Sequence, residues 1–292
     1  MEDKSYVLFS DSCCDLPEDL VEEIHLQVAP LSYSIRGKEY LNYPDHREMN
    51  NHVFFDLLRS GEISKTSQVT PGRYLEMMEP FLKDGKDILV VAFSSALSGA
   101  YASAVQAANY LSEIYPQRNI KVLDSLCASS GQGYLVYSMG KNKLRGMSLE
   151  DNLAWGETHR LHIAHWFTID SLQFLKRGGR LSASKAWLGT LLSLKPVLHV
   201  NDLGQLVPVE SVRGRKQSLL SLMKHFGETA IDPDKNFIMI VHGDDIVTAQ
   251  YLGEKLQKKY NIPRVIYCDL GPVIGSHAGP NTISVFFLAT ER

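Results

Sequence analysis

Short apolar runs that alternate with amphipathic stretches are the feature that most constrains the fold of this 292-residue chain. The runs are short enough to be buried strands, and the stretches between them carry apolar residues at helical spacing. Strands that alternate with helices are typical of α/β layers built on largely parallel sheets. We therefore predict an α/β fold with two domains, residues 1–160 and 161–292, each with a mainly parallel sheet.

The predicted elements are bounded by turn residues and by changes in hydrophobic period. In the first domain we expect strands at Tyr6–Phe9, Val28–Ser34, Ile88–Phe93 and Ile120–Leu123, and helices at Pro17–Ile24, Glu48–Arg59, Pro71–Leu82, Ala100–Ile114, Gly131–Leu144 and Leu149–Arg160. In the second we expect strands at Ile163–Ile169, Pro196–Val200, Leu206–Val212, Phe237–Val241, Val265–Cys268 and Ile283–Ala289, and helices at Lys216–Phe226 and Ala249–Tyr260.

The charge balance and the apolar runs exclude several classes of partner. A net charge of −3 gives no electrostatic reason to bind nucleic acid or an anionic membrane. No apolar run approaches transmembrane length, and the acidic start of the chain does not resemble a secretion signal. The four cysteines include no CxxC pair, which argues against zinc or redox chemistry. We expect a cytoplasmic protein with reduced thiols and no integral membrane association.

The segment Gly271–Pro280 combines unusual backbone control with a single imidazole. Two Gly-Pro pairs bound it, and His277 lies between them, directly before the last apolar run. Proline fixes φ and glycine permits positive φ, so the segment is expected to form tight turns that hold His277 rigidly. From these residues alone, a ligand-binding histidine and a structurally bonded one are equally good interpretations.

Hydroxyl side chains follow one buried strand and precede an alanine-rich helix. Ser94, Ser95 and Ser98 lie in this turn, and an anion is favoured at a helix N-terminus because its N–H groups are unpaired. Lys65-Thr66-Ser67-Gln68 offers a second set of donors before the helix at Pro71. Simple helix capping is the alternative interpretation of both segments.

Two basic clusters and three histidines are further candidate sites. The clusters Phe174–Arg180 and Val212–Lys216 are either an anion or partner surface or solvated loop charge. His159, His162 and His165 do not share one helix face, and no carboxylate has HExxH-like spacing, so we expect no metal site.

The chain lacks the usual sequence devices for nucleotides and for acyl hydrolysis. It contains no GxxxxGK[ST], no GxGxxG after the first strand and no GxSxG. Its candidate groups are hydroxyls and one restrained histidine, which suit hydrogen bonding to a small anion.

Taken together, these motifs resemble the DegV family of bacterial fatty-acid-binding proteins, which are also described as the binding subunits of fatty acid kinase. The resemblance runs almost end to end and departs from the family pattern at Cys13-Cys14, where small hydroxyl residues are usual. The segments that carry it are Asp11-Ser12, Asp15-Leu16-Pro17, Thr66-Ser67-Gln68, Pro71-Gly72, Phe93–Gly99, Asp124-Ser125, Gly131-Gln132-Gly133, Leu175–Arg180, Leu188–Leu192, Lys195-Pro196, Val212–Lys216 and Gly271–Pro280.

The resemblance implies that one long-chain fatty acid lies between the two domains. It places the carboxylate against the Thr of the TSQ motif and a Ser of the SSxLSG motif, with the His of the GxHxGP motif nearby. The ligand-binding residues that it implies here are Thr66, Ser94, Ser95, Ser276, His277 and Arg177. Arg213 and Arg215 are expected on the face that docks the kinase.

The resemblance also implies that this chain is a carrier and that the reaction belongs to a partner. A separate ATP-binding kinase subunit would phosphorylate the carboxylate to an acyl phosphate, with His277 as a possible assistant and no cofactor or metal in this chain. Two alternatives remain open at this point: a stand-alone phosphotransferase or hydrolase that uses Ser95 and His277, and a regulatory protein that senses lipid.

Overall fold

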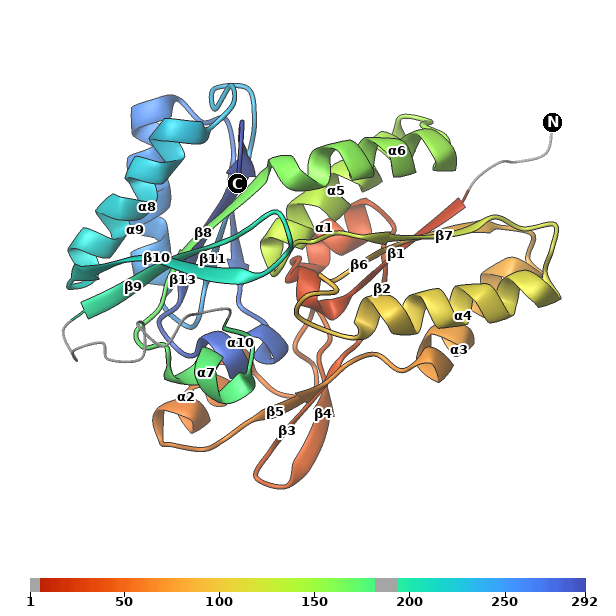
Figure 1. Ribbon diagram of the computed structural model, residues 1–292, viewed down its shortest axis with the longest axis horizontal. Helices are drawn as coiled ribbons and strands as arrows, with labels where there is room; N and C mark the ends of the chain where they lie inside the picture. The colour runs from red at the N-terminus through yellow and green to blue at the C-terminus, as the bar shows by residue number, and fades with distance from the viewer. Residues whose placement is uncertain (1–5, 182–193) are drawn as a thin grey trace.

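The computed structural model describes residues 6–181 and 194–292 and confirms the α/β fold (Figure 1). The segment Leu188–Leu192, one of those that carry the family resemblance, lies outside the described residues. None of the helices in the described part of the chain is long and apolar enough to cross a membrane.

A four-stranded parallel sheet forms the first half of the molecule, as the sequence predicts. Its strand order is β2-β1-β6-β7, and each neighbouring pair is parallel. Helices α5 and α6 cover one face and α3 and α4 the other, while the short α1 follows the 3₁₀ turn η1 (Figure 1). The bounds are β1 (Tyr6–Asp11), η1 (Ser12–Cys14), α1 (Glu18–Glu23), β2 (Gln27–Ala29), α3 (Pro71–Lys83), β6 (Asp87–Ala92), α4 (Ala100–Ile114), β7 (Ile120–Asp124), α5 (Ser130–Leu144) and α6 (Leu149–His159).

A six-stranded sheet forms the second half, and its prediction as mainly parallel is wrong. In the order β10-β9-β8-β13-β11-β12, only β11 and β12 pair in parallel, because β9–β10 is a hairpin and β13 inserts antiparallel between β8 and β11. Helices α8 and α9 lie on its outer face (Figure 1). The bounds are η2 (Arg160–His162), β8 (Ile163–Thr168), α7 (Gln173–Gly178), β9 (Leu194–Val200), β10 (Leu206–Arg213), α8 (Arg215–Thr229), β11 (Ile238–His242), α9 (Ile246–Tyr260), β12 (Val265–Asp269), α10 (Pro272–Ala278) and β13 (Ile283–Leu288).

A small antiparallel sheet splits the strand predicted at Val28–Ser34. Pro30 separates β2 from β3 (Ser32–Ile35), and proline cannot donate a hydrogen bond to a sheet. β3 pairs with β4 (Lys38–Leu41) and with β5 (Lys65–Ser67), and α2 (Asn51–Arg59) lies between these last two strands in the chain. This sheet carries Thr66 toward the second half of the molecule.

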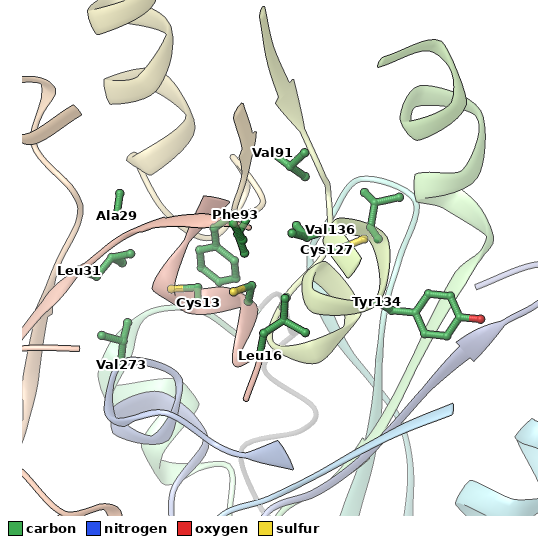
Figure 2. Packing of buried hydrophobic residues seen from close by; sticks show 14 of the residues in the cluster. Cys13, Leu16, Ala29, Leu31, Val91, Phe93, Cys127, Tyr134, Val136 and Val273 are labelled. Atoms are coloured by element: carbon green, nitrogen blue, oxygen red, sulfur yellow. The ribbon is translucent and has the colours of Figure 1, made fainter. Parts of the chain in front are cut away.

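One hydrophobic cluster runs from the parallel sheet into the six-stranded sheet. It joins β1 and β6 to residues of β8, β11 and α10, and α5 packs against strands of both sheets. Figure 2 shows Phe93 beside Cys13, with Val273 of α10 below Leu31. The two halves are therefore held together by buried apolar surface.

A surface ion-pair group also joins the halves. Arg59 of α2 donates to the Asp244 carboxylate at 2.5 Å, and His52 Nδ1 lies 2.9 Å from the same group. Deeper in the molecule, the Asn51 side chain donates to the backbone oxygen of Leu270 at 3.1 Å. These contacts fix α2 against the turn between β11 and α9 and against the segment that leads into α10.

Candidate functional site

The segment Gly271–Pro280 folds into a short helix rather than the tight turns expected from its sequence. Pro272 takes the first helical position of α10, where its missing N–H costs nothing, and Gly279 ends the helix with φ of 85°. Pro272 therefore marks the start and Gly279 the end of a helix of only two turns. The helix orients His277 toward β5.

Thr66 and His277 meet across the boundary between the two halves. Thr66 Oγ1 lies 2.8 Å from His277 Nε2, and both side chains are partly buried. The sequence indicated each residue separately, and the structure brings them together through the β3–β5 pairing and α10.

A cavity of about 370 Å³ opens beside this pair. Its partly exposed polar residues, called the rim below, make three separate contacts: Thr66 contacts His277, Gln68 adjoins Gly99, and Arg180 donates to the Leu97 backbone oxygen beside Ser98. The rest of the wall is buried and mostly apolar, with side chains from both halves of the molecule. The apolar wall residues are Leu31, Phe93, Leu97, Ala128, Phe167, Leu175, Val200, Leu206, Leu270, Val273, Ala278 and Phe286.

The N-terminus of α4 forms part of the rim. Ser98 accepts a hydrogen bond from the Ala100 N–H at 3.2 Å, so its own hydroxyl proton is available to another acceptor. Gly99 lies close to the Gln68 side chain, because a Cβ there would lie 2.0 Å from Gln68 Oε1 unless that amide moved. Partial positive charge at this helix end favours an anion at the rim.

Ser94 and Ser95 do not lie in the cavity lining that the structure describes. The buried Ser94 hydroxyl donates to the Gly204 backbone oxygen at 2.9 Å, and the backbone N–H of exposed Ser95 donates to the Asp124 carboxylate. Of the three serines in this turn, Ser98 is the one that lines the cavity. Locating the start of α4 at Ala100 is the signal that singles out Ser98, since only Gly99 separates that residue from the first helical turn.

The arginine at the rim is Arg180 rather than Arg177. Helix α7 ends at Gly178, and the left-handed Gly179 turns the chain so that Arg180 lines the cavity. Arg177 is exposed and stacks over Phe174. Ser276 is also outside the described lining: its hydroxyl donates to the Pro272 backbone oxygen and lies 2.7 Å from the Ser64 hydroxyl.

The two arginines predicted on a docking face differ in their surroundings. Arg213 is exposed on β10. Arg215 is only partly exposed, donates to the Asn281 backbone oxygen and lies 3.7 Å from Asp245. Arg215 thus joins α8 to the loop before β13, and only Arg213 presents its side chain to solvent.

His165 lines the deep wall and was not predicted as a site residue. It is 1% exposed, donates from Nδ1 to the Ile163 backbone oxygen and accepts the Ala128 N–H at Nε2. Burial lowers its pKa well below the usual value. His159 and His162 contact the backbone oxygens of Trp155 and Ala289 instead. His165 is therefore a neutral, fully bonded part of the wall.

The pKa of His277 is lowered to about 4, first by burial and then by the positive charges of Arg180 and Arg177. We expect an NMR titration of the ligand-free protein to give a midpoint near pH 4, with a neutral ring at pH 6. A midpoint near the ordinary value of 6.5 would show that water solvates the ring and would contradict this environment.

The arrangement can bind a molecule with an apolar body and a small anionic head. The hydroxyls of Thr66 and Ser98, the neutral ring of His277 and the cation of Arg180 line the rim, and the buried wall is mostly apolar. A cavity of this volume falls within the range of small-molecule sites.

Comparison with known proteins gives one consistent result. Residues 5–290 match the family model described as "Uncharacterised protein, DegV family COG1307". The DegV domain-containing protein CPE0026 of Clostridium perfringens is 40% identical over 289 residues, covering 99% of each chain.

Two solved structures share the fold. A fatty-acid-binding DegV family protein from Thermus thermophilus has a TM-score of 0.85 at 29% identity, with 98% of this chain and 99% of that chain covered. The Streptococcus pneumoniae Fatty Acid Kinase (Fak) B3 protein loaded with linoleic acid has a TM-score of 0.83 at 20% identity, with coverage of 97% and 99%. At the second identity the likeness concerns the fold alone.

Proposed function

Because the chain belongs to the DegV family, we propose that it binds one long-chain fatty acid in this cavity and presents the carboxylate to a partner fatty acid kinase. A carboxylate oxygen would attack the γ-phosphorus of ATP held by the partner, ADP would leave, and an acyl phosphate would form. In this proposal the chain is a cytoplasmic carrier without a cofactor, and its halves, residues 1–160 and 161–292, are two domains with the acyl chain between them.

The observation that carries the proposal is that one cavity combines partly exposed polar side chains, among them Thr66 and Arg180, with a buried wall that is mostly apolar. Burying about fourteen methylenes at roughly 0.8 kcal/mol each contributes on the order of 11 kcal/mol. Association and ordering of the chain cost several kcal/mol of this gain. The remainder supports tight binding and slow release, which suit a carrier of detergent-like molecules.

The rim residues suit a carboxylate that must remain reactive. Thr66 and Ser98 offer neutral hydroxyl donors, and Arg180, which donates to the backbone oxygens of Leu97 and Gly178, adds positive charge. Neutral donors stabilise the anion while leaving one oxygen open to the partner. Exposed Arg213 is the better candidate for contact with the kinase, since Arg215 is engaged within the chain.

The structure does not place the two residues that the stand-alone phosphotransferase or hydrolase alternative requires next to each other. That alternative requires Ser95 as a nucleophile beside His277, whereas His277 contacts Thr66 and Ser95 is exposed outside the described cavity lining. The lipid-sensing alternative shares the same cavity and differs only in what the partner does.

The kinase step is tested by reconstitution. The lipid-loaded protein is mixed with ATP and the ATP-binding subunit of a bacterial fatty acid kinase, and acyl phosphate is trapped with hydroxylamine. The proposal expects hydroxamate only when both proteins are present. Binding of lipid without any acyl phosphate would favour the lipid-sensing alternative, and acyl phosphate formed by this chain alone would contradict the carrier role.

Ser98→Ala is expected to weaken fatty acid binding about tenfold, because one hydrogen bond to a charged group is lost, worth about 1.5 kcal/mol. Ser95→Ala is the matched control, since it removes the same hydroxyl from the same turn outside the described lining. Competitive displacement of a fluorescent fatty acid measures both variants. Equal loss in the two, or loss in Ser95→Ala alone, would place the head group elsewhere.

A further inference from the structure

Gly178 makes the closest approach to the imidazole of His277. A Cβ added to Gly178 would lie 2.0 Å from His277 Nδ1 and 2.8 Å from its Cε1. A Cβ essentially never comes within 3.0 Å of a non-bonded heavy atom, so any side chain larger than hydrogen must displace the ring. At Gly178, helix α7 has no side chain, and its backbone packs against the face of α10 that carries His277.

The backbone of Gly178 does not itself require glycine. Its φ is outside the left-handed region, and it is the last residue of a helix, where alanine is ordinarily favourable. The next residue, Gly179, has φ of 68° and is the one that the turn requires. The reason for glycine at position 178 is therefore the ring of His277.

The two nitrogens of this ring have different surroundings. Nε2 lies 2.8 Å from Thr66 Oγ1, while Nδ1 is buried and has no hydrogen-bond partner among the residues that the structure describes. A buried N–H without an acceptor is rarer and more costly than a buried lone pair that lacks one donor. The proton of the neutral ring is therefore favoured on Nε2.

We propose that Gly178 is a positioning residue that holds His277 as the Nε2–H tautomer against Thr66. Nε2–H then donates to Thr66 Oγ1, and the Thr66 hydroxyl proton is free to point into the cavity toward an anionic head group. By closing off Nδ1, Gly178 keeps water from competing for the ring. The role toward a carboxylate rests on the proposed function, whereas the tautomer does not.

The tautomer is tested first on lipid-free protein with ¹⁵N-labelled histidine. We expect the His277 Nε2 signal in the range of a protonated nitrogen and the Nδ1 signal in that of an unprotonated one at pH 7. In Gly178→Ala the ring is displaced, so these two signals should move toward the averaged values of a mobile imidazole. Gly72→Ala is the matched control, because a Cβ there meets nothing nearer than Thr70 Oγ1 at 4.0 Å.

The effect on the reaction is then measured with the partner kinase. Gly178→Ala should retain bound lipid and lose about tenfold or more in acyl phosphate formation. Added to His277→Ala, it should cause no further loss, because Gly178 acts only through the ring.

Several results would overturn the inference. They are an Nδ1–H tautomer in the unmodified protein, unchanged ring signals in Gly178→Ala, or an equal loss in the His277→Ala background. If Gly178→Ala does not fold, the tautomer of the unmodified protein decides the question alone. Absence of lipid binding with the expected tautomer would instead reject the proposed function and leave the role of Gly178 standing.

Discussion

His277→Ala is expected to leave the fatty acid bound while lowering kinase-dependent acyl phosphate formation about 100-fold. Binding persists because the apolar wall supplies most of the affinity, and Thr66, Ser98 and Arg180 still face the head group. The reaction suffers because Thr66 loses the partner that orients its hydroxyl at 2.8 Å. Quantifying bound lipid and trapped acyl hydroxamate on the same preparation separates the two effects.

His159→Ala is the control for this variant. His159 lies outside the described cavity lining and bonds to the backbone oxygen of Trp155, so both readouts should stay at the level of the unmodified protein. Full activity in His277→Ala would reject the role of the Thr66–His277 pair. Loss of the lipid itself would show that the histidine binds the ligand rather than aids the transfer.

Ser284→Phe is expected to weaken binding of a long-chain fatty acid about 100-fold. Ser284 is 4% exposed and lines the cavity from β13, where it pairs with Phe167 of β8. A phenyl group there occupies the space of about four methylenes, at roughly 0.8 kcal/mol each. The same variant should accept shorter fatty acids with a smaller loss, which a chain-length series by calorimetry measures.

Ser284→Ala controls for the loss of the hydroxyl, because it leaves the cavity open and should keep long-chain affinity. Thermal unfolding of lipid-free Ser284→Phe checks that the aromatic ring is accommodated rather than overpacked. A folded Ser284→Phe variant with unchanged affinity for every chain length would mean that the acyl chain does not pass this part of the wall.

Three strands of the parallel sheet, β1, β6 and β7, are predictable because each is a short apolar run that precedes a helical pattern. Thr70 caps α3 by accepting the Arg73 N–H, and Pro71 begins the helix as expected. Strand direction in the second half is not predictable in this way. Alternation of strands and helices does not reveal that β13, the last strand, inserts between β8 and β11.

Two short elements, β5 and α10, are not predictable from the sequence for a related reason. β5 has three residues and α10 has seven, too few to show a hydrophobic period. In α10, the Gly-Pro pairs resemble turns until Pro272 and Gly279 are recognised as the two ends of one helix.

The site was predictable in its motifs but not in its side-chain directions. Thr66 and His277 were both expected, and they do meet at the rim of the cavity. Ser94 and Ser98 share a turn, as Arg177 and Arg180 share a segment, and only the backbone path decides which member faces inward. The left-handed turn at Gly179 directs Arg180 inward, and the start of α4 at Ala100 places Ser98 at the cavity.

The central claim is that the cavity holds one long-chain fatty acid, and native mass spectrometry tests it most directly. The purified protein is measured before and after organic extraction, and again after fatty acid is added back. The account predicts a one-to-one adduct that extracts as a long-chain fatty acid and returns on addition. A mass equal to that of the chain alone, unchanged by added fatty acid, would contradict it.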